Sequence, residues 1–357
     1  MTVPAPEPAD VVRLEAYLRS LGATDDEIVA AREAHGLGPL ALELALRAGS
    51  EPVGLDEAAA RLGATPDEVA RFWRALGFAD PAGRRMSARF VDAQTVISEA
   101  ATLWLGEETA LGIARVIGAS AAKLAEAIVD AYRIAFEVPE LSAGTNYSDV
   151  VEGYIGITRE TLPAFEAFVS EVFEAHLVRV AGSAWMPGED SATTSRELAI
   201  GFVDLVGYTA LARTLDARAL AALVNRFEDT VGDVLVRHGG RPVKTIGDGV
   251  MFAADSPQAG SAAALALAAA FPGSAGAPPV RVGLAYGSVL SLYGDYFGEV
   301  VNLAARLVAL ANPGTVVVSE AVAAAASEHR FERLPEQALK GFGTPPAVFR
   351  LVGGPGS

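Results

Sequence analysis

The sequence predicts an all-α domain over residues 1–180, followed by an α+β domain over residues 196–357. The chain has 357 residues, and at roughly 100–200 residues per domain this length suits two domains that each bury a core. Apolar residues recur at helical spacing in the first half, whereas strand-like and helix-like stretches alternate in the second. Between them, residues 181–195 are rich in Gly, Ser and Thr and lack periodicity, which is typical of an interdomain linker.

Composition excludes several classes of function. The chain carries 28 Lys and Arg against 44 Asp and Glu, a formal net charge of −16, whereas a generic nucleic-acid or anionic-membrane binder needs the opposite excess. The absence of cysteine excludes disulfides and Cys-based metal sites. The N-terminal residues do not resemble a signal peptide, and the most apolar window, residues 259–271, is too short to span a membrane. We therefore expect a cytoplasmic protein.

The first half is expected to consist of helices. A weak repeat at an offset of 41 residues relates Leu14–Ile28 to Leu55–Val69. In each copy two helices flank a Gly-containing turn, and a Thr followed by Asp and Glu supplies a helix cap and a negative first turn. Longer helices follow from about Ala93 to Phe136, and the segment from Arg159 to Val180 is strongly amphipathic. The last segment ends one residue before the linker and is expected to connect the two domains mechanically.

The second half follows the order βαββαβ with additional elements, which predicts a ferredoxin-like sandwich. Its first strand is expected at Glu197–Asp204. A hairpin is expected within Arg241–Ala253, where an Asp-Gly pair flanked by apolar residues places Asp248 at the tip. The other expected elements are helices at 217–238, 257–271 and 300–311, strands at 280–286 and 315–319, and a C-terminal pair ending at 351.

Two carboxylates of the second half are placed where they can bind metal. Asp204 ends a predicted buried strand and Asp248 lies at a predicted hairpin tip, both near glycines that permit the close approach of another group. Such a pair can hold two hard divalent cations, a common arrangement for displacement at phosphorus. Alternatively, Asp204 caps the following helix and Asp248 only favours the turn.

Lysines are rare, and two of them lie in the same half. The chain has three, Lys123, Lys244 and Lys340, against 25 arginines. In a chain that prefers Arg so strongly, a retained Lys indicates a need for a compact point charge. Lys244 precedes Asp248 by four residues, and Lys340 is followed by glycines suited to backbone contact with phosphate. Genome composition explains the scarcity of Lys but not these positions.

A predicted helix over residues 300–311 brings two polar residues to one face. Asn302 and Arg306 are four residues apart, a spacing that aligns them along a helix. Asp295 precedes Asn302 by seven residues across a Gly-rich turn. Alternatively, Asn302 is a hydrogen-bonded core amide and Arg306 is an ordinary surface residue.

Three segments together resemble the signature blocks of the class III nucleotide cyclases. They are Phe202–Thr209 (FVDLVGYT), Lys244–Gly249 (KTIGDG), and Asp295 followed by Val301–Arg306 (VNLAAR). The matches cover about residues 196–351 in the right order and at the right spacing. Their joint occurrence is far more specific than any single block. The resemblance implies a catalytic domain that converts ATP to 3′,5′-cyclic AMP and pyrophosphate.

The resemblance also implies a role for each matched residue. Asp204, Asp248 and the carbonyl oxygen of Leu205 would hold two Mg²⁺ or Mn²⁺. Asn302 would orient the ribose, and Arg306 would neutralise charge at the α-phosphate in the transition state. The expected substrate-binding groups are the backbone amides of Val206, Gly207, Tyr208 and Thr209 at the triphosphate, Lys340 at the terminal phosphates, and Lys244 with Asp295 at the base.

The expected base is adenine, and the expected assembly is a homodimer. Lys244 can only donate hydrogen bonds and an ionised Asp295 can only accept them, which matches adenine at its N1 and N6 positions rather than guanine. In this family the metal-binding and Lys/Asp/Asn/Arg residues meet across a subunit interface, which implies two composite sites per homodimer. Where some relatives carry a phosphate-binding Arg, this chain has Ser288, so Arg281 or Lys340 is expected to compensate.

The helical first half resembles, through less specific motifs, the N-terminal regulatory domain of soluble, pH-responsive mycobacterial adenylyl cyclases. This implies autoinhibition, with the segment from Arg159 to Ser195 as the switch between inactive and active dimers, and a fatty acid or another lipid as a ligand. His176 lies close to the linker beside Glu174 and Arg179, and an imidazole that titrates near pH 6.5 suits a pH switch. Alternatively, His176 is a solvent-facing residue.

Two other functions are considered. Gly54–Phe78 resembles a MerR-type winged helix-turn-helix, which implies a DNA-binding sensor with a nucleotide-binding, cyclase-like domain. Charge argues against DNA binding, because phosphate contacts supply most of the baseline affinity for DNA. Residues 1–180 contain 15 basic and 28 acidic side chains, a net charge of −13, whereas the remainder has a net charge of −3. The other alternative is a degenerate cyclase domain that only binds nucleotide, against which the complete six-residue set argues.

Overall fold

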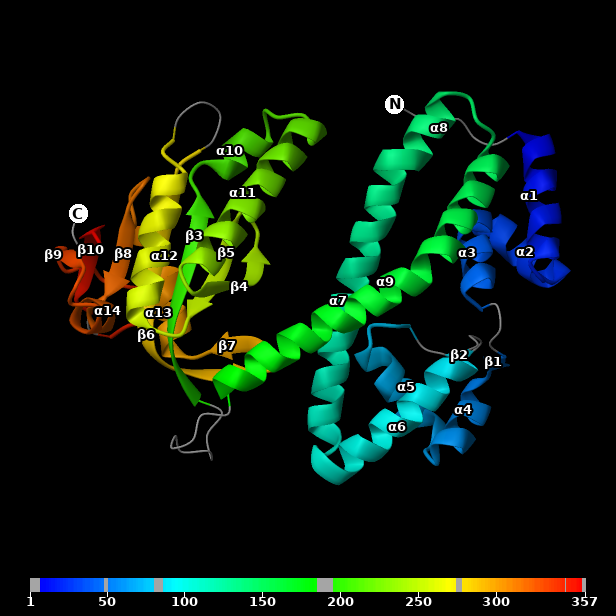
Figure 1. Cartoon of the computed structure of the whole chain (residues 1–357), viewed down its shortest axis with the longest axis horizontal. Coiled ribbons are helices and arrows are strands. Elements are labelled where there is room, and N and C mark those ends of the chain that lie inside the picture. Colours follow the sequence, from blue (N-terminus) through cyan, green and yellow to red (C-terminus); the bar gives the residue numbers. More distant parts are fainter. Residues whose placement is uncertain are drawn as a thin grey trace. The chain divides into compact units, whose positions relative to one another are not determined.

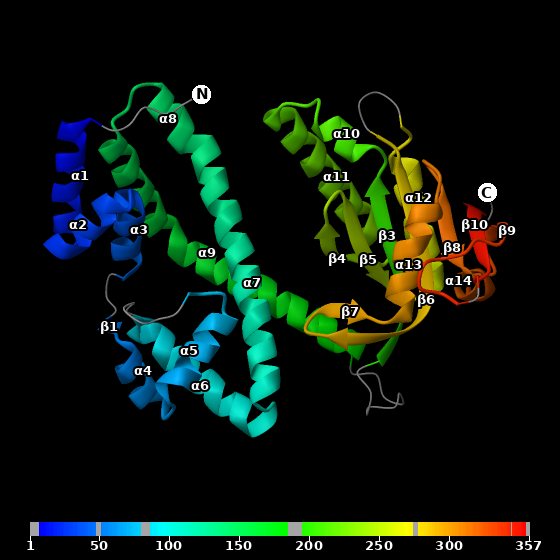
Figure 2. The ribbon, with the colours of Figure 1, turned by 180° about the vertical axis from the view of Figure 1, so that it is seen from behind.

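The chain folds as two units, Met1–Pro187 and Gly188–Ser357, which we describe separately (Figures 1 and 2). The computed structural model describes residues 7–47, 51–79, 86–184, 195–273, 278–343 and 345–354. The first unit is helical and the second is a mixed sheet covered by helices, so the predicted fold class is confirmed. Within the described ranges, no helix has the length and apolar character needed to cross a membrane.

The predicted linker lies mostly outside the described residues. Its first four residues, 181–184, continue the last helix of the first unit, and Ser195 begins the first strand of the second. Residues 185–194 are not among the described residues.

The first unit contains nine α-helices in its described part, together with one π-helical turn at Arg133–Glu137 and a pair of two-residue strands. These strands, β1 (Pro52–Val53) and β2 (Met86–Ser87), pair antiparallel and are the one departure from an all-helical prediction. The helices are α1 (Pro8–Ser20), α2 (Asp25–Glu33), α3 (Leu37–Arg47), α4 (Leu55–Leu62), α5 (Pro66–Ala75), α6 (Ala88–Trp104), α7 (Glu107–Tyr132), α8 (Val138–Ser142) and α9 (Tyr147–Ala184).

The sequence repeat forms the same local structure twice. In α2 the Thr24 hydroxyl accepts a hydrogen bond from the Glu27 amide, and the Glu27 carboxylate accepts one from the Thr24 amide. Thr65 and Glu68 make the same reciprocal pair at the start of α5. Each capping box satisfies backbone donors that a helix end otherwise leaves unpaired. The predicted helix-turn-capped helix is confirmed in both copies.

The amphipathic segment predicted from Arg159 to Val180 is helical but not covered by the first unit. It forms the second half of α9, and its apolar side chains remain exposed, including Phe168 at 65%, Phe173 at 64% and Leu177 at 56%. The first half of α9 behaves differently, because Val151 and Ile155 pack into a core shared with α1, α2 and α3. A single copy of the first unit thus leaves an apolar helix face open to a partner.

The second unit is built on an eight-stranded mixed sheet with the order β4-β5-β3-β6-β8-β10-β9, to which β7 adds by pairing with β6. Among the described strands, β6 and β8 form the one parallel pair. The strands are β3 (Ser195–Leu205), β4 (Gly240–Ile246), β5 (Gly249–Ala254), β6 (Val280–Leu292), β7 (Asp295–Phe297), β8 (Val316–Ser319), β9 (Arg330–Arg333) and β10 (Val348–Gly353). The helices are α10 (Tyr208–Ala212), α11 (Ala217–Arg237), α12 (Pro257–Ala270), α13 (Glu299–Leu310) and α14 (Glu320–Ala325).

Helices cover both faces of this sheet. On one face, side chains of α11, α12 and α14 form a core with alternate sheet residues such as Phe252 and Leu284. On the other face, α13 and the tip of the β6–β7 hairpin pack on residues such as Ile200 and Met251. Figure 2 shows α13 in front of the sheet, on the side opposite α12. Neighbouring residues such as Met251 and Phe252 belong to opposite cores because successive side chains of a strand point to opposite faces of the sheet.

The contact between α13 and the sheet depends on Gly283 in β6. A Cβ atom built at this position would lie 2.2 Å from the Val308 amide nitrogen and 2.6 Å from the Ala304 carbonyl oxygen. Both atoms belong to the helix backbone and cannot turn aside as a flexible side chain would. Glycine therefore sets the distance between α13 and the sheet, and with it the position of every side chain that α13 carries.

We expect Gly283→Ala to displace α13 and to lower the free energy of unfolding by about 1–3 kcal/mol, because the added methyl group overpacks a backbone contact. Chemical unfolding measures this effect. Gly232→Ala in α11 is the matched control, since a Cβ there meets no atom within 4 Å and should stabilise the helix by up to about 1 kcal/mol. Equal effects of the two substitutions would contradict the close packing of α13.

Candidate active site

Asp204 lies between two strands that each supply a functional neighbour. Its backbone is opposite Gly249 of β5 and opposite Arg281 of β6. The Arg281 guanidinium donates from Nε to the Asp204 Oδ2 atom at 2.7 Å, and its Nη2 lies 2.6 Å from the same oxygen. Burial raises the pKa of Asp204 above its ordinary value, Arg281 opposes this shift, and the negative charge of Asp248 adds to it. The two carboxylates are therefore close enough to interact.

Asp248 occupies the hairpin tip, as predicted, between β4 and β5. Gly247 before it adopts a φ of 61°, a left-handed conformation that glycine adopts without strain. The Asp248 carbonyl oxygen accepts a hydrogen bond from the Leu205 amide at 3.3 Å. This bond ties the tip to the end of β3, so Asp204, Leu205 and Asp248 come together at one end of the sheet.

The space beside Asp204 requires a glycine at position 249. A Cβ atom there would lie 2.9 Å from the Val203 carbonyl oxygen and 3.4 Å from Asp204 Oδ1. Any larger residue would crowd the carboxylate. The alternative that Asp204 caps the following helix is wrong, because Gly207 is the N-cap of α10 and no side chain caps that helix.

The donor set at this end of the sheet fits hard divalent cations. It consists of two carboxylates and a neighbouring backbone carbonyl, all oxygen ligands of the kind that Mg²⁺ and Mn²⁺ prefer. Among the described residues, no group of three or more His, Cys, Asp or Glu side chains is placed to hold a metal by itself. Mg²⁺ is commonly bound by one or two carboxylates together with substrate phosphates, so the site suits ions that arrive with a phosphorylated substrate.

The turn after β3 presents backbone donors, though one fewer than expected. The Val206 amide donates to the Pro279 carbonyl oxygen at 2.9 Å and is thus engaged within the protein. Gly207 has a φ of 77° and is the N-cap of α10. The amides of Gly207, Tyr208 and Thr209 make no hydrogen bond with any other described residue. Three donors rather than four are therefore available to an anion.

Lys244 and Asp295 form an ion pair across 51 residues of chain. Lys244 lies on β4, and Asp295 begins β7, which folds back along β6. The Asp295 Oδ1 atom also accepts a hydrogen bond from the Tyr296 amide at 2.8 Å, which fixes the carboxylate. Both side chains keep substantial exposure, 40% for Lys244 and 27% for Asp295, so the pair remains accessible to a ligand.

The other predicted site residues are solvent-exposed. Asn302 and Arg306 lie one turn apart on α13, and Lys340 lies in the loop before Gly341. The alternative that Asn302 is a core amide is wrong, because its neighbours Ala304 and Leu307 are buried and Asn302 is exposed. Exposed polar side chains beside a well-packed helix face are free to contact a substrate or a second subunit.

The contact between Arg281 and Asp204 was not predicted from the sequence. Arg281 was expected only as a substitute for the Arg that is absent at Ser288, a residue of β6 seven positions farther along. The contact could have been predicted from the antiparallel register of β3 and β6, which places Arg281 opposite Asp204. Register is a long-range property, so neither segment reveals it alone.

Comparison with known proteins supplies the family. A family model described as the adenylate and guanylate cyclase catalytic domain matches residues 191–349. An adenylate cyclase of Streptomyces coelicolor is 36% identical over 293 residues, which cover 81% of this chain and 76% of that protein. An uncharacterized protein of Mycobacterium tuberculosis is 36% identical over 358 residues, which cover 98% of this chain and 92% of that protein.

The chain belongs to the adenylate and guanylate cyclase family. It is a nucleotidyl cyclase, a lyase, with a helical region before the catalytic domain. A pH-sensitive adenylate cyclase of Mycobacterium tuberculosis is also similar, at 29% identity over 187 residues, which cover 50% of this chain and 46% of that protein. The similarity to the first two proteins covers 81% and 98% of this chain and so extends beyond the catalytic domain into the first unit.

His176, the predicted regulatory residue, lies on the exposed part of α9. Its Nδ1 atom is 3.2 Å from the Arg179 guanidinium, one turn farther along the helix. The Glu174 carboxylate instead lies 3.4 Å from the Ser170 hydroxyl. The imidazole is solvent-facing, as in the alternative reading of the sequence, and it lies beside the apolar side chains that α9 leaves open.

We expect the stability of the metal-free Asp204→Asn variant, relative to that of metal-free wild type, to increase as the pH rises from 4 to 7. A raised pKa means that the folded state holds the Asp204 proton more tightly than the unfolded state, whose carboxyl titrates near 3.9. Wild type therefore loses stability as pH rises from that value through the higher folded-state pKa, and the amide avoids the loss.

Thermal unfolding in EDTA at both pH values measures this difference. Asp233→Asn, at an exposed position of α11, is the matched control for losing one carboxylate. A gap between Asp204→Asn and wild type that stays constant from pH 4 to pH 7 would contradict the raised pKa.

Proposed function

We propose that this cyclase converts ATP to 3′,5′-cyclic AMP and pyrophosphate. The Lys244–Asp295 ion pair is the observation that carries the choice of nucleotide. Lys244 offers only donors and Asp295 only acceptors, and adenine presents an acceptor at N1 and a donor at N6. Guanine presents the reverse pattern and would leave both charged groups mismatched, which a hydrogen-bonding pocket penalises strongly. The relative from Streptomyces coelicolor named adenylate cyclase supports the same choice.

In this proposal the carboxylate end of the sheet holds the metal ions. Asp204, Asp248 and the Leu205 carbonyl oxygen would bind two Mg²⁺ or Mn²⁺. When bound, such ions lower the pKa of the ribose 3′-hydroxyl and neutralise the pyrophosphate leaving group. The close contact of Arg281 with Asp204 offsets one of the two carboxylate charges of the metal-free site. The partly exposed guanidinium can turn to a phosphate when a cation takes its place beside the carboxylate.

The remaining residues position the substrate and stabilise charge. Asn302 orients the ribose so that its 3′-oxygen lies in line with the bond from the α-phosphorus to pyrophosphate. Arg306 neutralises the charge that builds on the α-phosphate in the transition state. The terminal phosphates are bound by Lys340 and by the free amides of Gly207, Tyr208 and Thr209.

We propose a homodimer in which each site takes residues from both subunits. Apolar side chains near the site support a subunit interface, since Ile246 is 51% exposed beside the hairpin tip and Phe297 is 46% exposed at the end of β7. Leu290 and Leu292 of the same β6–β7 hairpin are also about half-exposed. Apolar side chains gathered around a polar site mark a surface that a partner covers.

We propose that the first unit regulates the catalytic unit, with α9 as the connecting element. Support comes from the exposed apolar face of α9 and from His176, an exposed residue beside that face and of the residue type most often used as a pH sensor. The relative named as a pH-sensitive adenylate cyclase is consistent with pH as the signal. The resemblance to regulatory domains also makes a fatty acid or another lipid a candidate effector.

Purified protein with Mn²⁺ should form cyclic AMP from ATP and little cyclic GMP from GTP. The double substitution Lys244→Glu with Asp295→Lys keeps an ion pair but exchanges donor and acceptor. We expect it to lower kcat/KM for ATP by roughly 100-fold or more and to reverse the preference towards GTP. Chromatographic separation of the products measures both activities.

Asp248→Ala is the control for this assay and should abolish both activities, because it removes a metal ligand without touching the base pocket. No cyclic nucleotide from the wild-type chain with either substrate would refute the proposed reaction. Unchanged preference in the charge-exchanged variant would refute only the role of Lys244 and Asp295.

Composite sites predict complementation between two inactive variants. Asp204→Ala and Asn302→Ala should each lose activity, but co-expression should restore about one quarter of it. Half of the dimers then contain one copy of each variant, and one of their two sites carries neither substitution. Co-expression of wild type with Asp204→Ala provides the reference activity against which this recovery is measured. A mixture as inactive as its components would show that each site is built within one subunit.

Regulation by the first unit is tested by a truncated chain of residues 188–357. If the first unit inhibits, the truncated chain should be several-fold more active per site than the full chain, and its activity should vary less with pH between 5 and 8. His176→Ala in the full chain should flatten the same profile. Identical pH profiles for all three proteins would argue against a regulatory first unit.

A further inference from the structure

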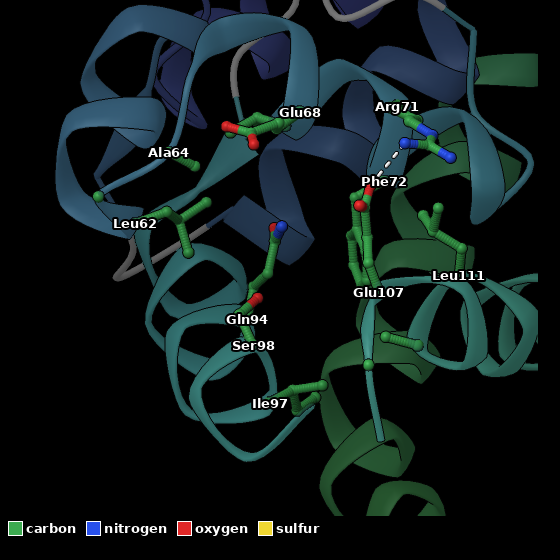
Figure 3. A pocket seen from close by; sticks show the side chains of 14 residues that line it. Leu62, Ala64, Glu68, Arg71, Phe72, Gln94, Ile97, Ser98, Glu107 and Leu111 are labelled. Carbon is green, nitrogen blue, oxygen red and sulfur yellow. Dashed lines mark hydrogen bonds and ion pairs between the residues drawn. The ribbon is translucent and has the colours of Figure 1, made fainter. Parts of the chain in front are cut away.

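A cavity of about 390 Å³ lies in the first unit, away from every residue assigned above to catalysis or regulation. It is open to solvent on one side and is lined by the turn between α4 and α5, one face of α6 and the start of α7 (Figure 3). Its volume falls within the range of small-molecule sites, roughly 300–1,000 Å³. We propose that this cavity binds a small uncharged molecule with an apolar body and one hydrogen-bonding group.

Gln94 is the residue that indicates a ligand. It lies on α6 with only 6% of its surface exposed, and its side chain projects into the cavity. No described residue forms a hydrogen bond with its amide group. Its amide atoms are not sealed inside the core but face the cavity, where they can form hydrogen bonds with a molecule that enters it. Gln94 offers both a donor and an acceptor at this position.

The walls of the cavity define an apolar body for the ligand. Leu62 and Val69 come from the α4–α5 hairpin, Phe72 from α5, and Leu111 from α7. Val69 and Leu111 are buried at 2% and 7% exposure. These side chains surround Gln94 with apolar surface. A molecule that fills the cavity gains from burial of its carbon atoms and from one directional contact with the amide.

Charges at the entrance disfavour an anionic ligand. Arg71 and Glu107 form an ion pair with a 2.5 Å contact, which joins α5 to α7 beside the cavity. Glu68 also borders the cavity, and its carboxylate accepts hydrogen bonds from Thr65. These two carboxylates and one guanidinium have a net charge of −1, and the guanidinium is already paired with Glu107. An acid would meet this charge without a free cation to balance it, so an uncharged molecule fits best.

This inference goes beyond the proposed function and does not depend on it. The cavity lies between the second copy of the sequence repeat and α6 and α7, so a ligand there would contact all four helices. The same α4–α5 pair resembles a MerR-type helix-turn-helix, but its Arg71 is committed to Glu107. A small molecule matches the cavity better than a phosphate backbone does.

Binding is tested on the full chain with N-phenyl-1-naphthylamine, an uncharged fluorophore whose single N–H can donate to the Gln94 side-chain oxygen. We expect a saturable rise in fluorescence with one site per chain. The comparison probe is 1-anilinonaphthalene-8-sulfonate, which has the same ring system with an added negative charge. Its affinity should be at least tenfold lower at this site. Equal affinity of the two probes at one shared site would overturn the preference for an uncharged ligand.

Two variants locate the probe. Ala110→Phe adds a ring where Ala110 of α7 lines the cavity, and Ala119→Phe adds the same ring at an exposed position of that helix. We expect the first to reduce affinity at least tenfold and the second to leave it unchanged. Gln94→Leu should also reduce affinity at least tenfold, because it removes the hydrogen-bonding group, while the unfolding temperature of the ligand-free protein should not fall.

Two results would each overturn the proposal. If Gln94→Leu lowers the unfolding temperature, the amide is a structural group, and the proposal fails. If both cavity variants bind the probe as wild type does, the probe occupies another place, such as the apolar cavity of about 300 Å³ beside Tyr132 and Tyr154, and the proposal also fails. If circular dichroism shows that Ala110→Phe is misfolded, Gln94→Leu decides alone.

Discussion

The pairing of β3 with both of its neighbours is the constraint on which the catalytic unit depends. One register places Asp204 opposite Gly249 on one side and opposite Arg281 on the other. A shift by one residue would turn Asp204 to the opposite face and exchange buried for exposed side chains along the whole strand. Two apolar cores, one on each face of the sheet, oppose such a shift. The chemistry at the strand end is thus fixed by packing along its length.

The second face of the sheet explains why α13 carries functional residues. Ala304 and Leu307 are fully buried against the sheet, and Gly283 lets the helix backbone approach β6 closely. A helix held in this way presents its exposed residues, Asn302 and Arg306, at a defined height above the sheet. Rigid placement matters for catalysis because small errors in position weaken the stabilisation of a transition state.

The first unit uses one local motif in two environments. Both copies of the repeat begin their second helix with the same capping box. The first copy packs against α9 and forms a continuous apolar core. The second copy faces α6 and α7 and leaves a cavity that contains the unpartnered amide of Gln94. Equal local sequence signals therefore lead to different roles, because the role depends on what each copy contacts.

Local chemistry was enough to predict much of this protein from its sequence. Capping residues, the Asp-Gly turn at Asp248 and apolar periodicity act over a few residues, and they indicated the main helices and strands and the hairpin correctly. The short elements β1, β2, β7, α10 and α14 were not predicted. Tertiary structure alone decided the contact of Arg281 with Asp204, the engagement of the Val206 amide by Pro279, and the exposure of the α9 face. These features arise from strand register and from packing between distant segments, and no short stretch of sequence carries that information.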